Sequence, residues 1–109
     1  MTQPILTMTA RHVQPGQVIT VAGLGQVTVG PAIYPNELPL DPIALFQMAK
    51  VAIPPTGDFM VVVSGFTPAA LAVLDAATSD IPRMVTFLHW NAQTGEYIPQ
   101  ALLSACYHG

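Results

Sequence analysis

The clearest pattern along the chain is a pair of short β-branched segments at residues 18–22 and 26–29, separated by Gly23 and Gly25. Within each segment, residues that would face one side of a strand alternate with residues that would face the other. Glycine supplies the positive φ of a tight turn, so the pattern predicts an N-terminal β-hairpin. The two glycines lack the third glycine and the following helix of a dinucleotide-binding fingerprint, so we assign them to the turn.

Two later segments open with a capping residue followed by proline, Asp41-Pro42 and Thr67-Pro68. Aspartate and threonine are good N-caps, and proline is accepted in the first helical turn. Apolar residues follow each opening at helical spacing, so the sequence predicts two short helices. The second has Asp75 as its only charge, which indicates burial on more than one side.

A continuous apolar run at residues 59–63 precedes the second predicted helix, and another strand-like run follows it at residues 84–90. A strand buried on both faces has such an uninterrupted apolar sequence. Residues 58–90 are therefore predicted to form a β–α–β unit.

The C-terminal part of the chain predicts a second hairpin turn at residues 90–97, with Gly95 at positive φ. Pro99 would interrupt the return strand or place it at a sheet edge. The tail from Gln100 to Tyr107 is apolar without a clear period, and it is predicted to form a short helix that begins after Pro99.

These elements predict a single domain, residues 1–109, of the α+β class. It would contain an N-terminal β-hairpin, two short helices on one face, and a β–α–β unit in a mixed or antiparallel sheet. The alternative is a mainly β sandwich or barrel with helical decorations.

The scarcity of charge narrows the function. The chain has three Lys or Arg and six Asp or Glu, so 8% of its residues are charged, against about 25% in an average domain. This excludes disorder, nucleic-acid binding by phosphate neutralisation and a polybasic membrane-surface protein. No apolar run approaches the roughly 20 residues that span a bilayer. Cys106 is the only cysteine, which excludes an intramolecular disulfide, and no secretory signal is seen, so a cytoplasmic location is expected.

Surface area turns this scarcity into an expectation about association. A compact monomer of this mass exposes on the order of 5,800 Å², which leaves about one charge per 640 Å². Most charged residues fall at predicted caps and turns, so the helix and strand faces have few charges of their own. We expect another chain to cover part of these faces. The alternative is a monomer coated with threonine, glutamine and backbone.

Candidate chemistry is sparse. Ser64, Gly65 and Thr67 lie between a buried strand and a helix N-terminus, where free N–H groups can hold an anion. A simple strand-to-helix turn is the alternative, since a phosphate loop has more glycines and a lysine. Cys106 and His108 could pair as nucleophile and base, but no third group is suggested to orient them. The metal donors show no paired spacing, so no metal, cofactor or catalytic residue is predicted.

Contact residues are predicted in two places. His89, Trp90 and Tyr97 flank the second turn, and Tyr34 and Leu38 lie in a proline-rich crossing loop at residues 31–42. Tryptophan and tyrosine are frequent interface anchors. For both groups the alternative is packing within the domain.

The leading functional hypothesis is a non-enzymatic structural or assembly protein that acts through subunit contacts, with a virus (phage) particle component as the concrete version. Its partners would be copies of itself or another protein, and its location the cytoplasm or the virion. One alternative is a small protein-binding module or inhibitor. A second alternative is a small oligomeric enzyme with a site shared between subunits.

Overall fold

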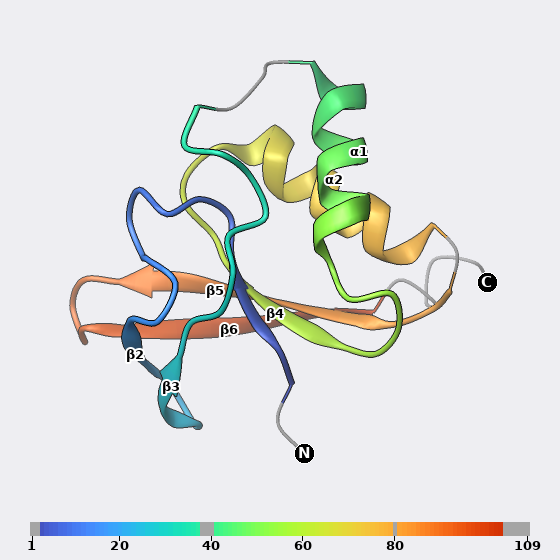
Figure 1. The fold of residues 1–109 in the computed structure, drawn as a ribbon. Coiled ribbons are helices and arrows are strands. Elements are labelled where there is room, and N and C mark those ends of the chain that lie inside the picture. Colours follow the sequence, from blue (N-terminus) through green and yellow to red (C-terminus); the bar gives the residue numbers. More distant parts are fainter. Residues whose placement is uncertain (1–2, 38–40, 80, 104–109) are drawn as a thin grey trace.

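The computed structural model describes residues 3–37, 41–79 and 81–103. These residues form six strands and two helices (Figure 1). In chain order the elements are β1 (Ile5–Thr7), β2 (Val18–Val21), β3 (Gly25–Thr28), α1 (Pro42–Ala52), β4 (Phe59–Val62), α2 (Thr67–Thr78), β5 (Met84–Asn91) and β6 (Glu96–Leu103).

The strands form one curled, mixed sheet in the order β1-β4-β5-β6-β2-β3 (Figure 1). β4 lies between β1 and β5 and is parallel to both, and β6 is antiparallel to β5. β2 pairs with β6 in parallel and with β3 in the antiparallel sense. α1 and α2 pack against each other on one side of the sheet (Figure 1). The mixed α+β class predicted from the sequence is confirmed.

The chain that follows β3 returns to the opposite edge of the sheet. Residues 30–34 lie along β1, where the Gly30 amide donates to the Ile5 carbonyl at 2.6 Å and the Ile33 amide donates to the Thr7 carbonyl at 2.8 Å. β1 is therefore held by β4 on one side and by this segment on the other. β1 was not predicted from the sequence, because three residues are too few to show a period.

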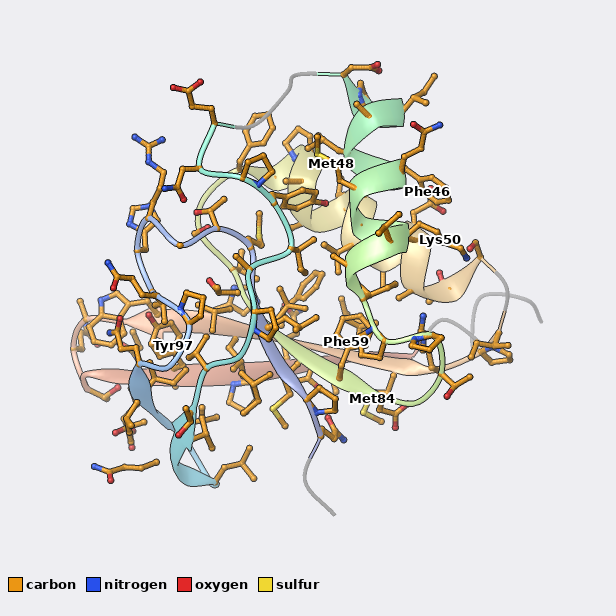
Figure 2. All side chains as sticks on the ribbon, in the orientation of Figure 1. Phe46, Met48, Lys50, Phe59, Met84 and Tyr97 are labelled. Atoms are coloured by element: carbon orange, nitrogen blue, oxygen red, sulfur yellow. The ribbon has the colours of Figure 1, made fainter. Side chains whose placement is uncertain are left out.

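Two hydrophobic clusters fill the two sides of the central strands. Phe59 and Val61 of β4 belong to the cluster beneath the helices, where Figure 2 shows Phe59 below α1. Val62 belongs to the second cluster, with residues of β2 and β6. All three side chains are at most 1% exposed. The prediction that this strand is buried on both faces is confirmed.

The N-cap of α1 is the residue predicted from the sequence, whereas the N-cap of α2 lies one residue earlier than predicted. The Asp41 side chain accepts a hydrogen bond from the Ile43 amide at 3.0 Å, which confirms Asp41 as the N-cap of α1. Thr67 was predicted to cap α2 but is its first helical residue. Phe66 is the cap, because its carbonyl accepts the bonds from Ala69 and Ala70.

The predicted helix after Pro99 is wrong as far as the described residues reach, because β6 continues through Pro99 to Leu103. The Ala22 amide donates to the Tyr97 carbonyl, so that carbonyl faces β2. In a strand, the nitrogen and the carbonyl of one residue point toward the same neighbouring strand, and this direction repeats every second residue. The nitrogen of Pro99, two residues after Tyr97, therefore also faces away from β5. The missing N–H of Pro99 therefore removes no hydrogen bond between β5 and β6. The remainder of the tail lies outside the described residues.

Tyr34 fastens the crossing loop to α2. Its side chain is 3% exposed, and its hydroxyl donates to the Ala69 carbonyl at 2.8 Å. Burial raises the pKa of Tyr34 to about 12, because the phenolate is poorly solvated there.

Because the pKa of Tyr34 is raised in the folded protein, the free energy of unfolding should fall as the pH becomes alkaline. Between pH 10 and about 12 the unfolded chain loses the Tyr34 proton while the folded chain keeps it. The stabilising contribution is complete below pH 10 and is lost as the pH rises through 12. Urea unfolding should show that Tyr34→Phe costs about 1–2 kcal/mol near neutral pH through the lost hydrogen bond. The gap between the two proteins should narrow above pH 10; a gap that stays constant or widens there would contradict the assignment.

Candidate functional site

A cleft of about 620 Å³ lies beyond the carboxyl ends of β4 and β5. It is bounded by β2, the turn between β5 and β6, and the segments that follow β1 and β4. The residues that line it are His12, Val13, Gln17, Val18, Ile19, Thr20, Val62, Val63, Ser64, Gly65, Trp90, Gly95 and Tyr97.

A second hollow of about 380 Å³ adjoins the first, and His12 and Ser64 line both. It adds Arg11, Asn36 and Glu37 to the lining, together with Thr9 and Phe66. We call the two hollows together the carboxyl-edge cleft. It has an aromatic half at Trp90 and a charged half at Arg11.

Strand direction explains why these residues meet. β1, β4 and β5 are parallel, so their carboxyl ends lie at one edge of the sheet. His12 follows β1, Ser64 follows β4, and Trp90 stands near the end of β5. Open sheets with parallel strands bind ligands beyond the carboxyl ends of those strands.

The aromatic half is built on a cross-strand pair. Trp90 and Tyr97 are opposite each other in the β5–β6 register, with ring centroids 5.2 Å apart and planes inclined at 57°. Tyr97 is buried, whereas Trp90 remains 57% exposed. Burial also raises the pKa of Tyr97, so its hydroxyl stays neutral. The pair fixes an exposed indole at the wall of the cleft.

The charged half holds one of the three cationic residues of the chain. Arg83 is buried under α2 and donates to backbone carbonyls, and the Lys50 ammonium donates to the Ser79 hydroxyl. Arg11 is instead exposed at the cleft, beside His12 and with Glu37 in the same lining.

The structure brings together four of the residues singled out in the sequence: Trp90, Tyr97, Ser64 and Gly65 all line the carboxyl-edge cleft. Gly65 has a φ of +79°, which makes the sharp turn from β4 into α2. Thr67 lines a different groove, on the helices.

The other predicted contact residues lie elsewhere. His89 is exposed, shares a hydrogen bond of 2.8 Å with the Gln100 side chain and lines neither hollow of the cleft. Tyr34 is part of the core. Leu38, Cys106 and His108 lie outside the described residues.

Arg11 and His12 are among the cleft residues that sequence reasoning did not assign to a site. Their position depends on β1, which the sequence pattern did not reveal. The signal that could have found them is the dipeptide itself, because two polar side chains follow the first apolar segment in a chain with three cationic residues.

A second surface lies on the helices. Ile43 and Val51 of α1 and Leu71 of α2 are 69%, 88% and 57% exposed. A groove of about 590 Å³ lies between the helices, lined by Pro42, Phe46, Thr67, Pro68, Leu71, Ala72 and Asp75. We call this surface the outer helical face. The two helices carry only two charged residues, Lys50 and Asp75.

In the part of the chain that the structure describes, no three potential ligands group together to hold a metal ion. His12 and Ser64 both line the cleft, and no hydrogen bond of the described residues activates the serine hydroxyl. The arrangement offers binding groups: an indole, a guanidinium, an imidazole and a hydroxyl.

Comparisons with protein-family models, curated proteins and solved structures find no match to this chain. Among the described helices, none has the length and apolar character needed to cross a membrane.

Proposed function

We propose that the protein is a non-enzymatic assembly subunit that binds a second copy of itself through the outer helical face. The observation that carries the proposal is the exposure of Ile43, Val51 and Leu71 on one layer of the molecule. Large apolar side chains exposed on the same helical layer of a small protein are typical of contact surfaces.

The charge on this face favours a second copy as the occupant. α1 and α2 carry Lys50 and Asp75, and the N-cap of α1 adds Asp41, so the layer has few charges. Two copies can approach through this layer with little of the repulsion expected for a chain of net charge −3. A two-fold axis would place the same patch of each copy in contact.

The wider hypothesis places such subunits in a virus particle or in a cytoplasmic assembly. The low charge and the high proline content of the chain support an assembly role. The outer helical face supplies one contact, and a larger particle needs at least one more.

Replacing Leu71 with lysine should break the association. Leu71 is exposed in the isolated chain, and lysine is a good helix former, so the fold should persist. Each copy in the dimer would lose a buried leucine, so we expect a loss of about 3 kcal/mol and a Kd raised about 100-fold. Val51→Lys, near the other end of the face, should act in the same direction.

Leu24→Lys is the matched control. Leu24 is 54% exposed, close to the 57% of Leu71, and it lies in the turn between β2 and β3, away from the helices (Figure 1). Light scattering over a range of concentrations should show wild type and Leu24→Lys above the 11.5 kDa of one chain, and Leu71→Lys at that mass. A wild-type monomer at all concentrations, or equal dissociation by the control, would refute the proposal.

A further inference from the structure

We infer that the carboxyl-edge cleft binds a nucleoside monophosphate, with the base against Trp90 and the phosphate at Arg11. The inference is independent of the proposed assembly, because it rests on a surface that does not include the exposed residues of the outer helical face. Figure 2 shows Tyr97, the partner of Trp90, on the far side of the molecule from the labelled residues of α1.

The exposed indole of Trp90 offers a surface on which a base can stack. Trp90 is the only tryptophan in the chain, and more than half of its surface remains open although Tyr97 supports it at 5.2 Å. A planar base can stack on such a ring, and every nucleobase has a suitable face. Val18, which is 55% exposed, adds an apolar wall in the same half of the cleft.

The guanidinium of Arg11 lies in the charged half of the cleft, where it can bind a phosphate. A guanidinium can make two parallel hydrogen bonds to a phosphate, and an imidazole N–H can donate another. Arg11 and His12 are adjacent in the chain and both line the charged half. Polyanion binding needs many such groups, whereas a single phosphate needs few.

Glu37 limits the negative charge that a ligand of the cleft can carry. Glu37 lines the same half as Arg11, so one fixed negative charge opposes any anion that enters. Because the charges of Arg11 and Glu37 offset each other, the extra charges of a triphosphate gain no net attraction from this pair, so the charged half favours a ligand with a single phosphate.

Size and polarity agree with this ligand class. Small-molecule sites commonly enclose about 300–1,000 Å³ and combine an apolar wall with a few polar groups. The aromatic half encloses about 620 Å³ and also presents Gln17, Thr20 and Ser64, which can bond to base edges or ribose hydroxyls.

Trp90 makes the test direct, because the intrinsic indole fluorescence of the protein comes from this one residue. Titration with AMP, excited beyond the absorption band of adenine, should give saturable quenching at concentrations below about 1 mM. Adenosine, inorganic phosphate and ATP should each bind at least about tenfold more weakly. Indole-3-acetate tests the other source of an aromatic anion; because it fluoresces like Trp90, its binding is measured by calorimetry, and it should also bind more weakly than AMP.

Variants then assign the two halves by calorimetry. Arg11→Gln should raise the Kd for AMP about tenfold or more and leave adenosine binding unchanged. Trp90→Leu should weaken both ligands about tenfold. Glu37→Gln should tighten AMP binding.

Two controls match these variants. Lys50→Gln removes a cation from α1, and His89→Gln removes an exposed imidazole that lines neither hollow; neither should change AMP binding. The absence of AMP binding up to about 1 mM would overturn the inference. It would also be overturned if adenosine, phosphate, ATP or indole-3-acetate bound as tightly as AMP. An Arg11→Gln variant with wild-type affinity for AMP would overturn it as well. The light-scattering outcome for Leu71→Lys does not affect any of these readings, so the two proposals fail separately.

Discussion

Replacing Arg83 with alanine is expected to lower the free energy of unfolding by about 3–5 kcal/mol, a large part of the roughly 5–15 kcal/mol typical of a small domain. The Arg83 side chain is 7% exposed and binds two separate parts of the chain, the end of α2 and the loop that contains Pro54 and Gly57. Its Nε donates to the Ala77 carbonyl in the last turn of α2 at 2.6 Å. One terminal nitrogen donates to the carbonyls of Pro54 and Gly57 at 2.7 and 3.1 Å.

The cost has three physical sources. Three carbonyl groups lose a charged donor, and the buried bond to the Ala77 carbonyl is the most expensive of the three to lose, because a buried acceptor without a partner is costly. The guanidinium also lies 5.4 Å from the centre of the Phe59 ring, so the cation–π contact is lost. A cavity remains where the side chain was.

Thermal and urea unfolding measure this effect. The melting temperature should fall by roughly 15 °C, from about 4 °C per kcal/mol for a domain of this size. Arg83→Lys should be intermediate, because lysine keeps the charge but not the planar fork of donors. Lys50→Met is the matched removal of an exposed cation and should cost less than about 1 kcal/mol. An Arg83→Ala protein within about 1 kcal/mol of wild type would show that these bonds contribute little.

Arg83 also shows why the scarce charges were informative. Asp41 caps α1, and Asp58 accepts a hydrogen bond from the Met84 amide where β4 and β5 begin. Arg83 joins the α2 terminus to a loop. The charges of Asp58 and Arg83 are therefore not available to the outer helical face, where Val51 is 88% exposed.

Local signals in the sequence predicted the elements that depend on local chemistry. The Asp41-Pro42 opening determines the start of α1 through one side-chain bond. The continuous apolar run in β4 follows from burial on both faces, which the sequence shows directly. Trp90 and Tyr97 were singled out together with His89 because they flank a tight turn, and in the structure this turn places Trp90 opposite Tyr97.

Features that depend on distant pairing were not predictable in the same way. β1 is a strand because β4 and residues 30–34 hydrogen-bond to it, and nothing within its three residues requires this. Arg11 reaches the cleft only because β1 is there. The extension of β6 through Pro99 depends on which side of the strand lacks a partner, a property of the sheet and not of the local sequence.

Gly30→Ala tests this distant pairing, and we expect it to destabilise the protein by about 2–4 kcal/mol. A Cβ atom at Gly30 would lie 2.6 Å from the Ile5 carbonyl oxygen, which is a backbone atom. That oxygen cannot move away cheaply, because β1 is paired with β4 on its other side. The chain would have to give up the bond from the Gly30 amide to Ile5, and with it the start of the contact along β1.

Hydrogen exchange separates this effect from a general cost of removing glycine. In Gly30→Ala the amides of Thr7 and Ile33, which bond across the same contact, should lose protection before the amides of β5. Gly23→Ala is the control: Gly23 has a φ of +83° but nothing within 4 Å of an added Cβ, so it should cost about 1–2 kcal/mol and leave Thr7 and Ile33 protected. If both variants lost protection at Thr7 equally, the close approach of Gly30 to Ile5 would not be what holds β1 in the sheet. Selective loss in Gly30→Ala would also establish that the strand supporting Arg11 and His12 depends on a residue about twenty positions away in the sequence.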